Sequence, residues 1–414
     1  MSTKSQALIA AFLMSAVAVP TTATAQQKAA AEASLPAPSK EARPALAALQ
    51  KAVNENKTAE IPALAQAALA AAKTPADRYY AYQLQLKPAV SANDEAQVLT
   101  ILEGLLATGI PQGADAANLA FNAAKINYNK GAADAAASAK ASTQIDQAIA
   151  ANPNNGDYYL ILGELRNRQK RPAEAVAALQ KAMSLSQAAG KPVDQKVADR
   201  ALAFAYNARL PIASELALAN LRAAPNTKNW RAAIKITEQT SNLPAPDKVD
   251  LFRLQRATNS FEGEADYYPY VDALLTRGLP GEAKAVLDEA FAAGKLDRNK
   301  ATWKDMQSAA AARVAADRAS LAAGEKAALS AATARPALAT GDAFLSYGDY
   351  AKAVAMYRAA LGKSGVDANL ANLRLGIALA RSGDKDGATT AFNAVKGTRS
   401  GIAQLWLTYL QRSA

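Results

Sequence analysis

Two residue types that build many catalytic and metal sites are missing from the 414-residue sequence, which contains neither cysteine nor histidine. Their absence excludes disulfide bonds, zinc sites with sulfur or imidazole ligands, and nucleophile–base pairs that use Cys or His. An enzyme built from this chain would have to use carboxylates, Lys, Tyr or Ser. We therefore expect a protein with no catalytic residues, no cofactor and no metal site.

Aromatic residues are also scarce, at 6% of the chain, whereas alanine is abundant. Alanine has a high helix propensity and a small side chain, so its helices pack closely but each buries little area. β-Branched residues do not cluster with the two-residue alternation of strands. The composition favours an all-α protein with many thin helix contacts, and the length suits several domains or one elongated array.

Long runs of one charge are absent as well. The formal charge of +11 comes from 47 basic and 36 acidic residues spread along the chain, without the Lys/Arg runs that grip nucleic acid. We therefore expect no nucleic-acid partner. Two readings of the positive excess stay open: an ordinary soluble surface, or affinity for an acidic protein, a polysaccharide or a membrane surface.

The first residues carry the features of an export signal. Lys4 precedes an apolar stretch over residues 7–19, and the small-residue sequence Ala23-Thr24-Ala25 follows. We predict a signal peptide over residues 1–25 that is cleaved after Ala25, with an uncleaved N-terminal anchor as the alternative. Residues 26–40 are predicted to form a flexible linker. The mature chain has no transmembrane segment by this reading, and we expect a periplasmic protein.

Three segments repeat one spacing of small and large residues. A glycine is followed 12 positions later by an alanine, then after 4 by a large apolar residue, then after 3 by a small or apolar one. The three sets are Gly163, Ala175, Leu179 and Ala182; Gly341, Ala353, Tyr357 and Ala360; and Gly376, Ala388, Phe392 and Val395. Weaker copies place the equivalent small residue at Ser214 and Ala283, so the period is about 35 residues.

Packing explains these residue types. A small residue on each helix of a hairpin lets the two helices approach closely, and the large residue fills the space between successive hairpins. Pro172, Pro211 and Pro280 suit the first turn of a helix, where the missing N–H costs nothing. Gly348 and Gly383 suit the tight reversals between helices.

This pattern resembles the tetratricopeptide repeat family, most closely in residues 157–183 and 335–396. The resemblance implies an all-α, right-handed α-solenoid of antiparallel helix pairs. It also implies a concave groove that is lined by the first helix of each pair and serves protein–protein contact. We expect degenerate helical hairpins over residues 41–332, and a C-terminal repeat pair with a capping helix over residues 333–414.

Helix pairs of the same size are expected in the rest of the chain. They are predicted at about 41–55 and 59–73, 75–92 and 94–108, 113–129 and 132–150, 193–208 and 210–223, 228–239 and 246–259, and 264–278 and 280–293. Residues 299–332 are rich in alanine and predict longer, less regular helices. The capping helix has one apolar stripe, formed by Ile402, Leu405, Trp406, Tyr409 and Leu410.

Short motifs with catalytic parallels are interpreted as structural. Gly362-Lys363-Ser364 lacks the earlier glycine and the preceding strand of a phosphate-binding loop. Ser382-Gly383-Asp384-Lys385 has the serine–lysine spacing of penicillin-recognising enzymes but lies in a predicted turn. The acidic group Glu262, Glu264 and Asp266 suits a helix start, where carboxylates are favoured.

The candidate binding residues are the first-helix positions that we expect to face the groove. They are Asp157, Glu164, Asn167, Arg168, Asp342 and Arg381. The inward-facing rows also contain Leu160 in one repeat, Leu338, Leu345 and Ser346 in another, and Leu373 and Ile377 in a third. A complete Lys/Asn/Arg clamp for a C-terminal carboxylate is missing, so this sequence does not predict recognition of chaperone tails.

We therefore predict a scaffold that binds other proteins of the cell envelope along its concave groove and serves in the assembly or maintenance of the envelope. An alternative is a protein that binds or guides an envelope polysaccharide or peptidoglycan, which exposure of Tyr79, Tyr159 and Tyr268 along one groove would support. Burial of all three tyrosines would remove the reason for this alternative. The structural interpretation is that one tyrosine of each cluster packs in the repeat core. A third hypothesis, an unrecognised enzyme, requires a pocket with two facing carboxylates.

Overall fold

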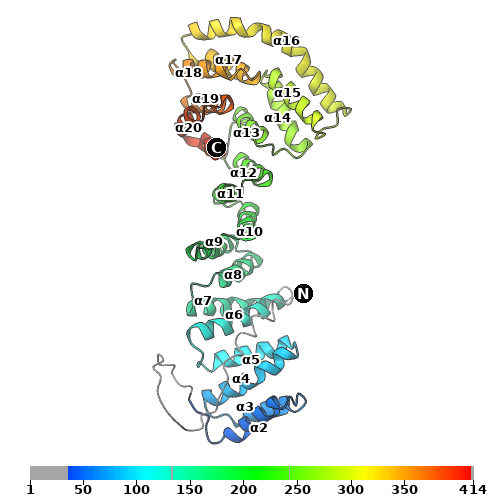
Figure 1. The fold of residues 1–414 in the computed structure, drawn as a ribbon, viewed down its shortest axis with the longest axis vertical. Helices are drawn as coiled ribbons and strands as arrows, with labels where there is room; N and C mark the ends of the chain where they lie inside the picture. Colours follow the sequence, from blue (N-terminus) through cyan, green and yellow to red (C-terminus); the bar gives the residue numbers. More distant parts are fainter. Residues whose placement is uncertain (1–35, 132–133, 242, 412–414) are drawn as a thin grey trace. The chain divides into compact units, whose positions relative to one another are not determined.

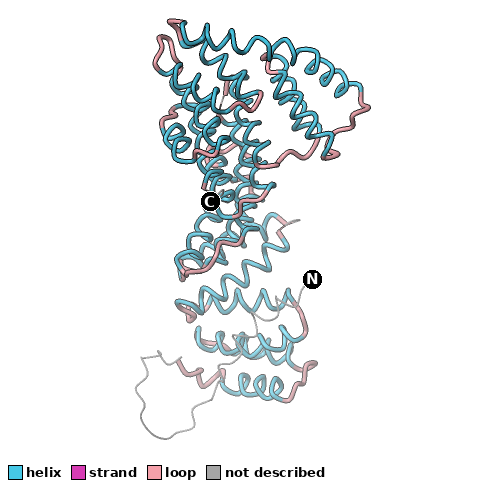
Figure 2. The backbone as a smooth tube through the Cα atoms, turned by 45° about the horizontal axis from the view of Figure 1, so that its top comes forward, coloured by secondary structure: helices cyan, strands magenta, loops and turns pink. Residues whose placement is uncertain are grey.

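A computed structural model describes residues 36–131, 134–241 and 243–411. These residues contain twenty α-helices, α2 to α21, and no β-strand beyond one isolated bridge between Thr333 and Ser364 (Figures 1 and 2). The predicted signal peptide, 1–25, lies outside the described residues, as does the predicted linker up to residue 35. None of the described helices combines the length and the hydropathy that crossing a membrane requires.

Contacts divide the chain into two units: unit 1 ends at Phe204 and unit 2 begins at Ala205. The helices of unit 1 are α2 (Arg43–Asn54), α3 (Ile61–Ala71), α4 (Pro75–Ser91), α5 (Glu95–Ala107), α6 (Gly113–Lys130), α7 (Ala135–Ala151), α8 (Gly156–Arg168) and α9 (Pro172–Ala188). Helix α10 (Gln195–Asn207) contains the boundary.

Unit 1 is a stack of hairpins, in which α2 packs on α3, α4 on α5, α6 on α7 and α8 on α9. First helices of successive pairs also touch, as α6 and α8 do. Each hairpin therefore packs mainly against its neighbours in the chain, as in a solenoid.

The helices of unit 2 are α11 (Ala213–Ala223), α12 (Thr227–Thr240), α13 (Lys248–Ala257), α14 (Glu264–Thr276), α15 (Pro280–Ala292), α16 (Ala301–Ser330), α17 (Ala334–Ser346), α18 (Tyr350–Leu361), α19 (Ala368–Ser382), α20 (Lys385–Asn393) and α21 (Ser400–Leu410). Two short 3-10 helices are η2 (Ala245–Asp247) and η3 (Gly397–Arg399). The α-solenoid class of antiparallel helix pairs is confirmed.

Two details differ from the sequence prediction. Residues 299–332 were expected to form longer, less regular helices; the helix is indeed long, but it is one continuous helix of 30 residues, α16. Its alanine content explains the continuity, because alanine has the highest helix propensity. In α11 the buried small residue is Ala213 rather than Ser214, which is only partly buried, so the degenerate repeat is shifted by one position.

The small–large pairs of the three clearest repeats lie in direct contact. A Cβ atom added to the glycine would lie under 3 Å from the large side chain in each pair: Gly163 with Leu179 (2.8 Å), Gly341 with Tyr357 (2.7 Å), and Gly376 with Phe392 (2.6 Å). The remaining repeat residues are buried; they are Ala175, Ala182, Ala353, Ala360, Ala388 and Val395. Close helix approach therefore depends on the missing side chain of each glycine.

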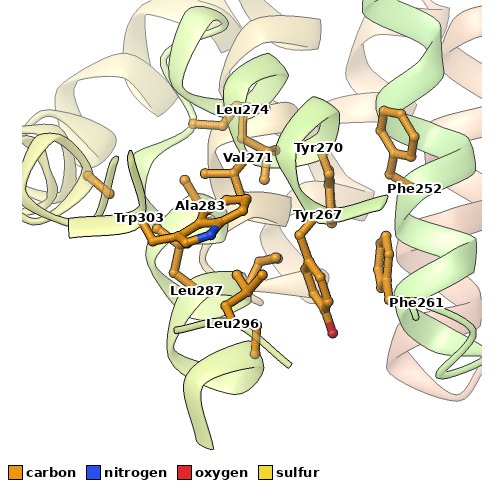
Figure 3. Close-up of a cluster of buried hydrophobic side chains, with 14 of the residues drawn as sticks. Phe252, Phe261, Tyr267, Tyr270, Val271, Leu274, Ala283, Leu287, Leu296 and Trp303 are labelled. Atoms are coloured by element: carbon orange, nitrogen blue, oxygen red, sulfur yellow. The ribbon is translucent and has the colours of Figure 1, made fainter. Parts of the chain in front are cut away.

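The aromatic core of unit 2 lies where α13, α14, α15 and α16 meet (Figure 3). The Phe261 ring stacks on Tyr267 and Tyr270, with ring centroids 4.6 Å and 5.8 Å apart. Trp303, at the start of α16, is 1% exposed and packs into the same cluster. This anchor holds the long helix on the α14–α15 hairpin.

Unit 2 also joins helices that are far apart in the sequence. Helix α21 packs on α12 and α13 as well as on its chain neighbours α19 and α20. Arg399 Nε donates to Asp247 Oδ2 over 2.7 Å, and Trp406 Nε1 donates to the Asp250 carbonyl over 3.4 Å. The last helix therefore returns to the first helices of the unit, and unit 2 is closed where an open solenoid would have two separate ends.

Candidate functional site

The first candidate face is carried by α8 in unit 1. Glu164 pairs with Arg200 of α10 over 2.6 Å. Arg168 stacks on Tyr128 of α6, with its guanidinium 3.9 Å from the ring centroid, and donates to the Tyr128 carbonyl over 2.6 Å. The predicted groove-facing residues of α8 are therefore flanked by α6 and α10, the first helices of the neighbouring pairs; we call these residues the α8 row. We call the surface of these three helices the α8 face.

The α8 face is open to solvent. Asp157 is exposed, while Leu160, Glu164, Asn167 and Arg168 are partly buried and none is fully buried. Within the described residues, the side chains of Asp157 and Asn167 have no hydrogen-bond partner. These two side chains can bind a partner without breaking an existing contact.

A hollow of about 530 Å³ lies at one end of this row, where α8, α9 and the start of α10 meet. Its apolar lining residues include Leu160, Met183 and Val197. Asp157, Lys191 and Asp194 supply charged groups. A hollow with this mixed lining can accept a polar or an apolar side chain of a protein partner. The sequence predicted Asp157 and Leu160 but missed Met183 and Val197, because no repeat position marks them.

The candidates in unit 2 lie in a different environment. Arg381 is exposed, and its Nε donates to the Tyr350 hydroxyl over 3.3 Å. Asp342 is 6% exposed and accepts from Arg374 over 2.8 Å, from Arg277 over 2.9 Å and from the Tyr357 hydroxyl over 2.7 Å. This corrects the expectation that Asp342 contacts a partner: its carboxylate is used inside unit 2.

Asp342 belongs to a buried cluster of charged side chains, which we call the hub: Asp250, Arg253, Glu282, Asp342 and Arg374. Asp250 binds Arg253 over 2.8 Å and Arg374 over 3.2 Å. Arg253 binds Glu282 over 2.7 Å. Every member is at most 6% exposed. The hub thus ties together α13, α15, α17 and α19, although the Asp250–Arg374 pair is separated by 124 residues in the chain.

Two carboxylates of the hub, Asp250 and Glu282, are held in their ionised form. Burial by itself would raise the pKa of Asp250, but the positive charges of Arg374 and Arg253 outweigh it and hold that pKa below its usual value. The pKa of Glu282 is likewise lowered, because Arg253 outweighs the effect of burial. A carboxylate that stays ionised cannot act as a general acid near neutral pH. The facing carboxylates that an enzyme would require are here each bound to arginine.

Aromatic hydroxyls complete the hub. Tyr270 donates to Glu282 over 2.6 Å, and burial raises the pKa of this tyrosine well above its usual value, as it does for Tyr357. The Glu282 backbone N–H also donates to the Ser346 hydroxyl over 2.9 Å. Sequence reasoning missed the hub, since its members belong to four helices without a common motif.

The inward-facing rows expected in unit 2 are consequently part of its interior. Fully buried members are Asp342, Leu345, Ser346, Leu373 and Ile377, whereas Leu338 is partly buried. No member of the equivalent row on α8 is fully buried. A first-helix row that is open along its length is therefore found on α8, whereas in these rows of unit 2 only Arg381, at the end of α19, is exposed.

Asp77 fixes the start of unit 1. Its carboxylate is fully buried and accepts from the Ser39 N–H (2.7 Å) and hydroxyl (2.8 Å), and from the N–H groups of Lys73 (2.8 Å) and Thr74 (2.9 Å). Thr74 accepts from the Asp77 N–H in return, which completes a capping box. Ser39 lies in the segment that was predicted to be a flexible linker, so the last residues of that segment are held in place.

We expect Asp77→Asn to destabilise unit 1 by about 1.5–3 kcal/mol at pH 7, because the bonds of a charged acceptor are lost. Although burial opposes it, the set of hydrogen bonds holds the pKa of Asp77 far below its usual value. A lowered pKa stabilises the fold above about pH 4, the unfolded value, and the benefit falls as the pH drops further. The difference between wild type and variant should therefore shrink from pH 5 to pH 2.

Urea unfolding followed by circular dichroism measures this difference, with tryptophan fluorescence reporting unit 2 separately. Asp115→Asn is the control, because Asp115 is exposed at the start of α6. This control should change stability by less than about 0.5 kcal/mol. A difference between wild type and Asp77→Asn that is constant with pH would contradict the assigned role.

The small acidic group of residues 262–266 is structural in the same way. Asp266 is 1% exposed and accepts from Arg231 over 2.8 Å and from Lys235 over 3.0 Å. Glu262 pairs with the same Arg231 over 3.1 Å. Glu264 binds Lys300 and the Trp303 N–H. These pairs connect α12, α14 and α16 and leave no free carboxylate pair.

The tyrosines divide between core and surface. Tyr158 and Tyr270 are fully buried, and Tyr268 is 47% exposed. Tyr79 and Tyr159 are partly buried, and the Tyr159 hydroxyl donates to the Pro153 carbonyl over 3.0 Å. Of the three tyrosines on which the polysaccharide alternative depends, only Tyr268 is strongly exposed.

The two short motifs with catalytic parallels lie at helix ends. Lys363 Nζ donates to the Leu329 carbonyl over 2.9 Å and Ser364 Oγ to the Ala332 carbonyl over 3.0 Å, which joins the end of α18 to the α16–α17 connection. Gly383, with φ of 92°, ends α19 in the left-handed conformation. Both segments therefore have structural roles.

Comparison with protein families identifies tetratricopeptide repeats in two parts of the chain. Residues 138–190 and 338–401 match the model of the tetratricopeptide repeat, and these ranges contain the three clearest small–large sets. No curated protein sequence matches the chain.

Comparison with solved structures gives matches of low sequence identity. A chain of the Naa15/Naa10 structure bound to HypK-THB is 13% identical, with a TM-score of 0.42 over 87% of this chain. This chain spans only 58% of the length of that one. A tetratricopeptide repeat protein from Parabacteroides merdae is 12% identical, with a TM-score of 0.27, over 82% of this chain and all of the other. A chain of the APC/C hetero-tetramer Cut9–Hcn1 is 12% identical, with a TM-score of 0.21. That match covers 88% of this chain and 66% of the other.

Proposed function

We propose that this protein is an exported scaffold for protein–protein interaction in the cell envelope, and that it binds its partner with the α8 face of unit 1. Tetratricopeptide repeats in the matched segments are consistent with a scaffold, because stacked helix pairs present long surfaces to partners. The export part rests on the predicted signal peptide, residues 1–25.

The observation that carries the proposal is the contrast between equivalent rows. The α8 row is open and includes two polar side chains without a hydrogen-bond partner within the described residues, and it ends in a hollow with a mostly polar lining and a few apolar side chains. Most members of the rows on α17 and α19 are buried in the hub or beside it, although Arg381 at the end of α19 is exposed. A partner can therefore reach the first-helix surface on α8 without unfolding any part of the protein.

The α8 face is also preorganised. Arg168 is held by its stack on Tyr128 and by its bond to the Tyr128 carbonyl, so a partner does not have to order this long side chain. Leu160 and Met183 offer an apolar contact, and Met adapts to side chains of different shape. This arrangement suits an apolar anchor residue with polar neighbours on the partner.

Affinity capture from envelope extract tests the proposal, with the mature chain from Gln26 onward as bait and mass spectrometry as readout. We expect one stoichiometric protein, and we expect Leu160→Glu to weaken its binding at least about tenfold, because a charge replaces an apolar contact in the hollow. Ala177→Glu, on the exposed side of α9, is the matched control and should bind normally.

Two outcomes would count against the proposal. Equal loss of the partner in both variants would show that the α8 face has no special role. Recovery of a polysaccharide without a protein would favour the alternative function.

A further inference from the structure

The hollow at the end of the α8 row has a negatively charged side. Asp157, in the first turn of α8, and Asp194, just before α10, both line it. Both residues are exposed, and neither carboxylate is in an ion pair within the described residues. Asp194 Oδ1 accepts from the Lys196 N–H over 2.8 Å, which uses only one of its two carboxylate oxygens. Two carboxylates of one hollow are therefore available to a cation.

The end of α9 adds to this negative side. Leu185, Ser186 and Ala189, from the last turn of α9 and its C-cap, line the same hollow. A helix C-terminus carries a partial negative charge, and the last turn of α9 contains no basic residue to offset it. Lys191 is the one basic residue among the described residues of the lining, and it is exposed. Two carboxylates and a helix end therefore face a single lysine, and this balance favours a cation.

The loop of residues 152–155, which contributes to the lining, is held in shape without a partner. The Asn155 side chain accepts from the Asp157 N–H over 3.0 Å. The Tyr159 hydroxyl donates to the Pro153 carbonyl over 3.0 Å. Because these bonds already fix the loop, a ligand does not have to order it, which lowers the cost of binding.

We propose that this hollow receives a lysine or arginine side chain of the protein partner, beside the apolar residue that contacts Leu160. The inference rests on the proposed function, since it names the chemistry of the partner for the same surface. Met183 and Val197 contact the aliphatic stem of the basic side chain, and Asp157 and Asp194 bind its charged head. Such charge complementarity selects a basic segment and rejects an acidic one.

Selection from a random peptide library tests the inference, with the chain from Gln26 onward as bait. We expect enrichment of peptides in which a lysine or arginine stands beside an apolar residue. The most enriched peptide then serves as a fluorescent probe. Asp157→Asn and Asp194→Asn should each weaken its binding about twofold to fivefold, the range of exposed ion pairs. Asparagine is as good a helix cap as aspartate, so Asp194→Asn removes the charge and keeps the start of α10.

Two further variants separate the local charge from a general effect. Lys191→Gln should strengthen binding of the probe by up to about fivefold, because it removes the positive charge of the lining. Asp134→Asn is the matched control. Asp134 is an exposed carboxylate at the N-cap of α7, and it does not line the hollow. This control should leave the affinity for the probe unchanged.

Several outcomes would overturn the inference. These are enrichment of acidic or uncharged peptides, enrichment of no peptide, and equal affinities for the probe in Asp157→Asn, Asp194→Asn and Asp134→Asn. Failure of the proposed function is judged separately, by capture from envelope extract. A captured protein whose binding is the same in the variants of Asp157 and Asp194 would overturn this inference alone, and the scaffold function would stand.

Discussion

Replacing Arg374 with methionine is expected to lower the free energy of unfolding of unit 2 by about 3–5 kcal/mol, the cost of removing one partner from a buried ion pair. Arg374 binds both Asp250 and Asp342, so its loss leaves two buried carboxylates with one arginine fewer. Methionine keeps much of the side-chain volume. The decrease in the free energy of unfolding therefore reflects the lost charge and not a new cavity.

Tryptophan fluorescence makes this measurement specific. All three tryptophans, Trp230, Trp303 and Trp406, belong to unit 2 and are at most 2% exposed. In Arg374→Met, the urea concentration at the midpoint of the fluorescence-detected unfolding transition should therefore be much lower than in the wild type. Arg381→Met on the same helix is the control, and it should shift by less than about 1 kcal/mol because Arg381 is exposed. Equal shifts in the two variants would disprove a special role for the hub.

Gly376→Ala is expected to destabilise unit 2 by about 1–3 kcal/mol, although alanine is normally the better helix residue. The added Cβ would lie 2.6 Å from the Phe392 ring, and neither helix can move without disturbing its other contacts. Overpacking therefore outweighs a gain in helix propensity of about 1 kcal/mol.

The sign of the Gly376→Ala effect should reverse once the ring is removed. In a Phe392→Leu background the side chain is smaller, so Gly376→Ala should be neutral or stabilising by up to about 1 kcal/mol. Fluorescence-detected unfolding of the wild type, the two single variants and the double variant gives the coupling free energy between positions 376 and 392. Additive effects would mean that the glycine is not required for close approach to Phe392.

Repeat positions could be predicted because each depends on residues close in the sequence. Gly163 and Leu179 are 16 positions apart, and their spacing alone marks the two helices of one hairpin. Helix boundaries followed from the same local pattern, as in α15, where Pro280 stands in the first turn. In the degenerate α11, the small repeat position was misplaced by one residue because Ala213 and Ser214 are both small. The helix itself begins at Ala213, so Pro211 precedes it and does not stand in its first turn.

The hub could not be predicted, because its contacts depend on the closure of unit 2. Nothing near Arg374 in the sequence points to Asp250, which lies 124 positions earlier. Asp342 was assigned to a groove because its repeat position faces inward, and in unit 2 the inward side is occupied by Arg374 and Arg277. On α8, where no such closure occurs, the same reasoning led to residues on an open surface.

The central claim is that the hub makes unit 2 one cooperative structure, whereas unit 1 is a row of neighbouring hairpins. Native-state hydrogen exchange of the unmodified chain at increasing denaturant tests it most directly. Amides of α13 and α19 should exchange through one common opening of the highest free energy in unit 2, while α2 to α9 should open in steps. Separate openings of α13 and α19, each following its own neighbours, would contradict the claim.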